Sequence, residues 1–242
     1  MTEGNRNTAL LIDADNASHA GIDAVLTVMA ELGEVNIRRA YGNWRKQALK
    51  GWVDKLHVYG IEPQQQFDMT KGKNATDMKM TIDAMDMLFS GRVNGFGIMS
   101  SDSDFMPLAM RIRQDGFPVY GFGSAKTPEA FKAACSRFID VDALVRGEKS
   151  AKSGEAKASN GNGERRSVDD KLIALLVDAY NASDRDERGY ASLSQVGQRA
   201  GNRSSFDVRN YGFSRLSDLF ETVPNFQTER REDGQLWVKR MR

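Results

Sequence analysis

Short apolar runs alternate with longer amphipathic segments through residues 1–145, and this alternation restricts the fold more than any other feature. In the first amphipathic segment the apolar side chains recur every three to four residues, as on the buried face of a helix. Strands that alternate with helices form a parallel sheet with helices on both faces, which is an α/β fold. We expect strands at residues 8–13, 34–41, 61–67, 95–100, 117–122 and 138–141, and helices at residues 18–32, 44–59, 75–90, 104–115 and 127–136.

Residues 146–166 separate this region from the rest of the chain. They contain no aromatic residue and no Leu, Ile, Val or Met, and they are rich in Gly, Ser, Ala, Lys and Glu. Such a segment buries too little apolar surface to offset the entropy of ordering it. We therefore expect a flexible linker at 146–166 between a first domain at 1–145 and a second domain at 167–242.

The second domain has a different pattern. Residues 168–180 form one amphipathic helix, residues 191–201 and 204–210 two short helices joined by a turn, and residues 215–220 another helix. Residues 226–239 indicate a hairpin that turns at Asp233 and Gly234. Helices followed by a hairpin predict a small winged helix-turn-helix domain.

Composition excludes several classes of protein. The single cysteine, Cys135, rules out a disulfide framework and any zinc or iron–sulfur site that needs several cysteines. No apolar run reaches the ~18 residues of a membrane span, and residues 1–8 lack the apolar core of a signal peptide. We expect a soluble, cytoplasmic protein without a membrane partner. The net charge of +1 is too small to indicate nucleic-acid binding, which must be argued from local sites.

Carboxylates follow two of the expected strands. Asp13 comes directly after the apolar residues 10–12, and Asp102 and Asp104 follow residues 97–100. Ligands of open parallel sheets bind at the carboxyl ends of the strands, where the winding direction reverses. With the strand order 3-2-1-4-5, strands one and four are neighbours at that point, so these acids face one crevice. Asp77, in the first turn of the helix before strand four, is expected to approach the same crevice.

Carboxylates gathered in one crevice repel one another, by about 4 kcal/mol for a pair 4 Å apart at an effective dielectric near 20. A bound cation removes this cost, and oxygen donors without His or Cys suit Mg²⁺ or Mn²⁺. Such an ion favours chemistry on a phosphate ester. The alternative is that each acid only caps a turn or a helix. Asn16 can orient a bound water or a phosphate, or cap the next helix, and Asp83 lies too far around its helix from Asp77 to be a clear ligand.

Three motifs together resemble the NYN family of the PIN-like nuclease superfamily. They are LLIDADN at residues 10–16, the K-x-x-x-D element that ends at Asp77, and SSDSDF at residues 100–105. The resemblance implies a Rossmann-like fold and metal-dependent cleavage of RNA. Carried over by position, it implies that Asp13, Asp77, Asp102 and Asp104 bind the metal and that Asn16 assists.

The C-terminal region is similar to the OST-HTH or LOTUS domain, whose members bind RNA or protein partners. The similarity rests on LSQVG at 193–197, FDVRNYGF at 206–213, residues 216–219, and Trp237 with Val238. Cations lie among aromatic side chains here, a mixture suited to phosphates and bases, although a solvated surface beside core aromatics gives the same pattern. The candidate RNA-binding residues are Arg38, Arg45, Lys46, Lys71 and Lys73 in the first domain, with Tyr41 or Trp44 as a stacking platform, and Arg209, Tyr211, Arg215, Arg230, Arg231 and Lys239 in the second.

The sequence therefore favours a metal-dependent endoribonuclease that uses Mg²⁺ or Mn²⁺, with a C-terminal module that binds RNA or a protein partner. Self-association stays open. One alternative is a non-catalytic RNA-binding or scaffold protein that keeps the carboxylates for folding. A second is a phosphatase of the haloacid-dehalogenase type, but its D-x-D-x-T/V pattern breaks here at Ala17.

Overall fold

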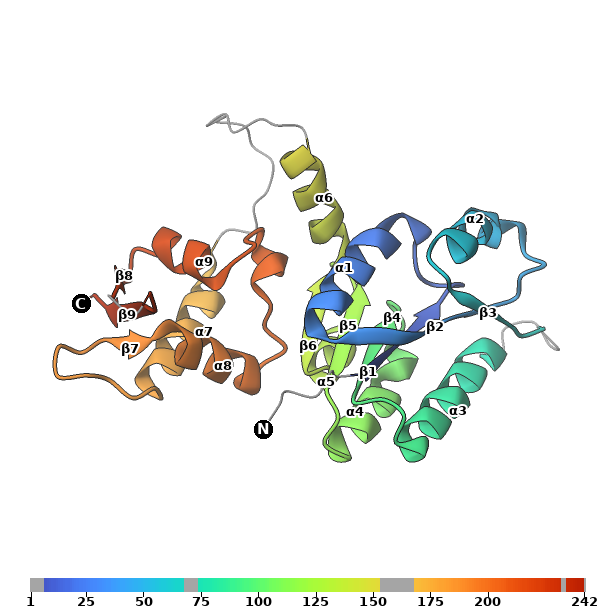
Figure 1. Ribbon diagram of the computed structural model, residues 1–242, viewed down its shortest axis with the longest axis horizontal. Helices are drawn as coiled ribbons and strands as arrows, with labels where there is room; N and C mark the ends of the chain where they lie inside the picture. Colours follow the sequence, from blue (N-terminus) through green and yellow to red (C-terminus); the bar gives the residue numbers. More distant parts are fainter. Residues whose placement is uncertain (1–6, 68–73, 153–167, 232–233, 242) are drawn as a thin grey trace. The chain divides into compact units, whose positions relative to one another are not determined.

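A computed structural model describes residues 7–67, 74–152, 168–231 and 234–241 (Figure 1). The chain divides into two compact units, Met1–Glu148 and Lys149–Arg242. Each unit has its own hydrophobic core and is described by itself.

The first unit is built on a parallel sheet in the order β3-β2-β1-β4-β5-β6. This order confirms the prediction that the first and fourth strands are neighbours. The carboxyl ends of β1 and β4 therefore lie side by side, where the winding direction reverses. The strands are β1 Asn7–Asp13, β2 Glu34–Gly42, β3 Glu62–Gln65, β4 Gly95–Met99, β5 Val119–Gly123 and β6 Arg137–Asp140.

Helices cover both faces of this sheet, as predicted. On one face lie α1 Ile22–Leu32, α2 Lys50–Val58 and α6 Val141–Lys152 (Figure 1). On the other lie α3 Ala75–Ser90, α4 Met106–Gln114 and α5 Glu129–Ala134. Three short 3-10 turns, η1 His19–Gly21, η2 Gln47–Leu49 and η3 Ser103–Phe105, precede α1, α2 and α4.

Strand β1 is the centre of the sheet, and its side chains divide between the two cores. Leu10 and Ile12 pack with α1 and α2, whereas Ala9 and Leu11 pack with α3 and α4. A strand buried on both faces has a continuous apolar sequence rather than an alternating one. Packing on both faces of β1 therefore fixes the position of its last residue, Asp13.

The end of the first unit differs from the sequence expectation. Residues 146–152, expected to begin the linker, continue helix α6. Val141, Leu144 and Val145 anchor the start of this helix on the core, and the Lys, Ala and Glu residues that follow are good helix formers. The rest of the expected linker, from residue 153 on, lies outside the described residues.

The second unit is a small domain with a three-stranded antiparallel sheet in the order β7-β9-β8. Its core gathers Leu176, Val196, Phe220 and Val238. The helix expected at 204–210 is reduced to the 3-10 turn η4, and the two-residue β7 was not expected because it is too short to show a period. Asp233 lies outside the described residues. The elements are α7 Asp170–Asn181, β7 Ala191–Ser192, α8 Leu193–Arg203, η4 Val208–Tyr211, α9 Leu216–Thr222, β8 Phe226–Arg230 and β9 Leu236–Arg240.

In the described parts of both units, no helix combines the length and the apolar character needed to cross a membrane.

Candidate metal centre

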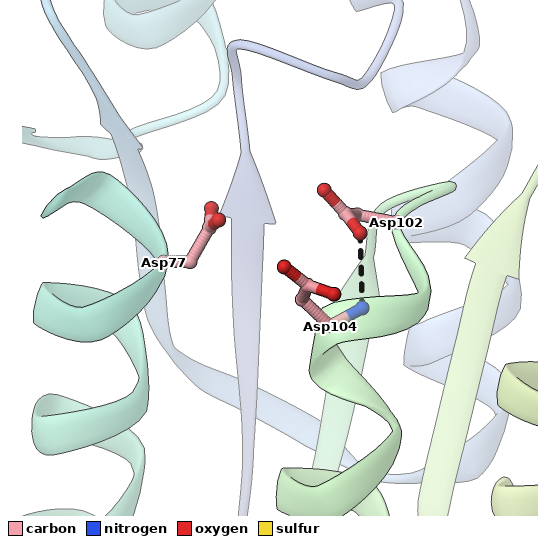
Figure 2. Close-up of side chains that lie close together, drawn as sticks. All are labelled: Asp77, Asp102 and Asp104. Carbon is pink, nitrogen blue, oxygen red and sulfur yellow. Dashed lines mark hydrogen bonds between the residues drawn. The ribbon is translucent and has the colours of Figure 1, made fainter. Parts of the chain in front are cut away.

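Three carboxylates from two separate elements converge at the carboxyl end of β1. Asp77 comes from the first turn of α3, and Asp102 and Asp104 come from the segment that leads from β4 into η3. Figure 2 shows Asp77 on one side of the end of β1 and the other two on the opposite side. Each offers one oxygen such that all three oxygens lie within 4.8 Å of one another.

Local hydrogen bonds hold the Asp102 and Asp104 side chains in place. Asp102 caps η3, with one carboxylate oxygen accepting from the Asp104 amide N–H at 2.9 Å (Figure 2). Asp104 accepts from the Asn74 side-chain amide at 2.6 Å. The capping role that we raised as an alternative is therefore present at Asp102, but it occupies only one of its two oxygens.

Asp13 lies beneath this group and is fully buried. Its Oδ2 accepts from Ser100 Oγ at 2.7 Å and from Asn16 Nδ2 at 2.9 Å, and its Oδ1 accepts from the Asn16 backbone at 3.3 Å. Ser100 Oγ in turn accepts from the Asp102 amide N–H at 3.0 Å. Asp13 therefore fixes the turn that carries Asp102, and Asn16 is bound to Asp13.

The electrostatics of the cluster are unfavourable for ionised acids. The pKa of Asp77 is raised from 3.8 to about 6, first by burial and then by repulsion from Asp13, Asp102, Asp104 and Asp15. Burial also raises the pKa of Asp13, although the hydrogen bonds from Ser100 and Asn16 oppose the shift. Among the described residues, no ion pair joins a Lys, Arg or His to Asp77, Asp102 or Asp104. A cation at the cluster relieves this repulsion.

The donor set suits a hard divalent ion. The three side chains supply only carboxylate oxygens, the ligands that Mg²⁺ and Mn²⁺ prefer. Neighbouring Asp15 is engaged differently, because it accepts from Thr76 Oγ1 at 3.2 Å and pairs with Lys46 at 3.1 Å. Asp15 is thus neutralised by a lysine, whereas Asp77, Asp102 and Asp104 have no cationic partner among the described residues.

Asp83 belongs to a separate buried network on α3. Its carboxylate accepts from the Tyr41 hydroxyl at 3.1 Å, from Arg39 at 3.4 Å and from Lys79. Tyr41 is fully buried, so the expectation that it offers a stacking platform is wrong. The burial of Tyr41 was not foreseen because helix α3 covers this face of β2, and the sequence of β2 alone does not show this.

The cations expected along the crevice have varied surroundings. Arg38 donates to the backbone carbonyls of Val35 and Tyr59, at 3.2 and 2.8 Å. Arg45 lies over the ring of Phe67, with 4.8 Å between guanidinium carbon and ring centroid. Lys71 and Lys73 lie outside the described residues.

In the second unit the expected residues are only partly available to a ligand. Arg209 pairs with buried Asp207 at 3.0 Å, and Tyr211 is half-buried against the core beside Phe206. Arg215 is exposed just before α9. The remaining expected cations lie on or directly after the strands. Arg230 is exposed at the end of β8, Arg231 after it lies over Trp237 and pairs with Asp186, and Lys239 on β9 lies near the ring of Tyr190.

Sequence reasoning missed two residues that shape the site. Ser100 links Asp13 to Asp102, and Asn74 holds Asp104. A Ser directly after a buried strand and an Asn before a helix are common caps, so only their position beside the acids could have marked them. Phe67 was assigned to a strand, and its exposure was not foreseen.

Comparison with known proteins gives two matches to family models. The model described as NYN domain matches residues 7–142, and the model described as OST-HTH/LOTUS domain matches residues 164–238. An uncharacterized protein of Methanocaldococcus jannaschii is 25% identical over 126 residues, which are 50% of this chain and 49% of that protein. The chain thus spans about half the length of this curated relative. A crystal structure of a protein of unknown function from Vibrio parahaemolyticus has a TM-score of 0.49 and 18% identity, and the match covers 59% of this chain and 96% of that one.

Proposed function

This chain belongs to the NYN domain family and continues into an OST-HTH/LOTUS domain, and we propose that it is a divalent-metal-dependent endoribonuclease. The two domains together support an RNA-related nuclease or binding function. The observation that carries the finer proposal is the convergence of Asp77, Asp102 and Asp104 without a cationic partner among the described residues.

In this proposal Asp77, Asp102 and Asp104 hold Mg²⁺ or Mn²⁺. When bound at such a site, the ion lowers the pKa of a water molecule and stabilises negative charge on a phosphoryl oxygen. Asp13 was expected among the ligands, but its fully buried carboxylate is engaged by Ser100 and Asn16. We assign it a positioning role, through the Ser100 hydroxyl that receives the Asp102 amide.

The acid cluster is accessible to a phosphodiester from solvent. Asp104 is exposed and Asp102 partly exposed, so a substrate approaches from the side of η3. Without a cation, the carboxylates repel the phosphates of RNA as they repel one another. Cleavage is therefore expected to depend strictly on the divalent ion.

The second unit is proposed to capture RNA or a partner protein. Cations lie beside aromatic rings at β8 and β9, as in Arg231, directly after β8, which lies 3.8 Å from the Trp237 ring centroid and also pairs with Asp186. Such pairs bind phosphates and stack on bases.

The test is cleavage of end-labelled single-stranded RNA by the purified full chain with Mn²⁺ or Mg²⁺, and with EDTA in parallel. We expect internal cuts only with the metal, and a loss of at least ~100-fold in rate for Asp102→Asn. Asp86→Asn, an exposed acid on the outer side of α3, is the matched control and is expected to cleave normally. Thermal melting shows that both variants are folded.

Equal cleavage by Asp102→Asn, or cleavage in EDTA, contradicts the assignment. RNA that is bound by the wild type but never cut, across several RNAs and both metals, selects the non-catalytic RNA-binding alternative.

A further inference from the structure

An exposed aromatic side chain lies at the edge of the sheet that carries the acid cluster. Phe67 follows the carboxyl end of β3 and is 45% exposed. The guanidinium of Arg45, from the segment after β2, lies 4.8 Å from its ring centroid. A single exposed phenyl ring is common on protein surfaces, so what distinguishes Phe67 is its position at the carboxyl ends of the strands.

Hydrogen bonds cross-link the two segments that carry this pair. Gln65 Nε2 donates to Asn43 Oδ1 at 3.2 Å, and Gln65 Oε1 accepts from the Trp44 amide N–H at 3.1 Å. The Trp44 indole N–H donates to the Gln64 carbonyl at 3.1 Å. These bonds link the segments after β2 and β3, so the backbone positions that carry Phe67 and Arg45 are held close together.

The same edge connects this pair to the acid cluster. Strands β3, β2 and β1 are consecutive neighbours, and two strand spacings amount to about 10 Å. The Lys46 side chain, one residue after Arg45, pairs with Asp15 beyond the end of β1. A strand of a few nucleotides laid along the carboxyl ends of β1, β2 and β3 therefore reaches both places.

We propose that Phe67 and Arg45 form a nucleobase-stacking subsite that holds single-stranded RNA while a neighbouring phosphodiester lies at Asp77, Asp102 and Asp104. The inference rests on the proposed nuclease function and names its substrate class. A phenyl ring and a guanidinium plane both stack on exposed bases of any sequence, whereas the bases of a duplex are already stacked on one another.

The chain contains a matched control for this pair. Phe89 near the C-terminal end of α3 is 71% exposed, and the Arg111 guanidinium lies 5.7 Å from its ring centroid. Helix α3 runs from the acid cluster back toward the amino ends of the strands, so Phe89 is an exposed phenyl with an arginine but lies away from the proposed RNA path.

The experiment measures binding of a short single-stranded RNA that carries 2-aminopurine to the full chain with Ca²⁺ in place of Mn²⁺, so that the carboxylates are neutralised, and a gel checks that the RNA stays uncut. We expect Phe67→Ala to weaken binding about 10-fold, which corresponds to about 1.4 kcal/mol, and to abolish the quenching of 2-aminopurine at one position of the RNA. We expect Phe67→Trp to keep both signals, Phe89→Ala to bind as the wild type does, and duplex RNA to show no dependence on Phe67.

Cleavage with Mn²⁺ is measured in parallel and separates the two proposals. If the wild type cleaves and Phe67→Ala binds and cleaves like Phe89→Ala, the subsite is refuted while the nuclease stands. If nothing is cleaved but Phe67→Ala alone loses binding and quenching, the subsite stands and the nuclease is refuted. If the wild type binds no single-stranded RNA, the subsite is refuted as well.

Discussion

Replacing Asp77 by Asn is expected to stabilise the metal-free protein near neutral pH. The folded state raises the pKa of this carboxyl from 3.8 to about 6, first through burial and then through the neighbouring acids. A carboxyl whose pKa is higher in the folded state destabilises the fold when it is ionised. This cost is fully present above about pH 6, decreases as the pH falls from about 6 toward 3.8, and is lost only below about pH 3, where the group is protonated in both states.

The size of the effect follows from the shift. A rise from 3.8 to about 6 corresponds to about 3 kcal/mol at about 1.36 kcal/mol per pKa unit. Because the side chain is partly exposed, solvent screening reduces this to roughly half. Asn also loses the favourable interaction of a carboxylate with the first turn of α3, about 0.3–1 kcal/mol. A net gain of about 1 kcal/mol remains, or about 2–4 °C in melting temperature.

Thermal and urea unfolding in EDTA, near pH 7 and near pH 4.5, measure this gain. We expect Asp77→Asn to melt higher than the wild type at the upper pH, and the pKa-linked difference to shrink to about a third at the lower pH, where the unfolded carboxyl is still mostly ionised. Asp86→Asn, exposed on the same helix, is the control and is expected to change little at either pH. With Mn²⁺ added, the order reverses, because only the wild type gains stability by binding the ion. An Asp77→Asn protein that is less stable than the wild type in EDTA near pH 7 would refute the reasoning.

Three other perturbations test the supporting structure. Ser100→Ala removes the donor to buried Asp13 and the acceptor of the Asp102 amide N–H, so we expect the free energy of unfolding, measured in urea, to fall by about 1–3 kcal/mol. The pKa of Asp13 also rises further, which moves the acid limb of the pH–rate profile of cleavage to higher pH. Asp83→Ala leaves Tyr41 and Arg39 without their shared acceptor, and we expect it to cost about 2–4 kcal/mol while the residual folded protein still binds Mn²⁺, as a metal titration would show. Phe220→Ala empties the core of the second unit at a cost of about 3–5 kcal/mol, and calorimetry should show that unit melting earlier while the Mn²⁺-dependent transition of the first unit stays in place.

The sequence predicted the sheet well because its signals are local. Apolar runs mark the strands, and the handedness of βαβ connections leaves few strand orders, so the proximity of Asp77 and Asp102 followed from topology. Their role as ligands stays a prediction.

Side-chain partners were predicted less well because they depend on distant residues. The burial of Tyr41 requires α3 to cover β2, and the exposure of Phe67 depends on where β3 ends. The hydrogen bond that engages the Asp13 carboxylate comes from Ser100, 87 positions away. None of these pairings leaves a periodic signal in the chain.

The most direct measurement is the anomalous scattering of a crystal of the full chain soaked in Mn²⁺. The central claim is that Asp77, Asp102 and Asp104 together hold a divalent ion. We predict an anomalous peak bonded to oxygens of these three carboxylates, and no such peak in Asp102→Asn crystals. A well-diffracting soaked crystal with no manganese at this position, or with manganese bound only elsewhere, would contradict it.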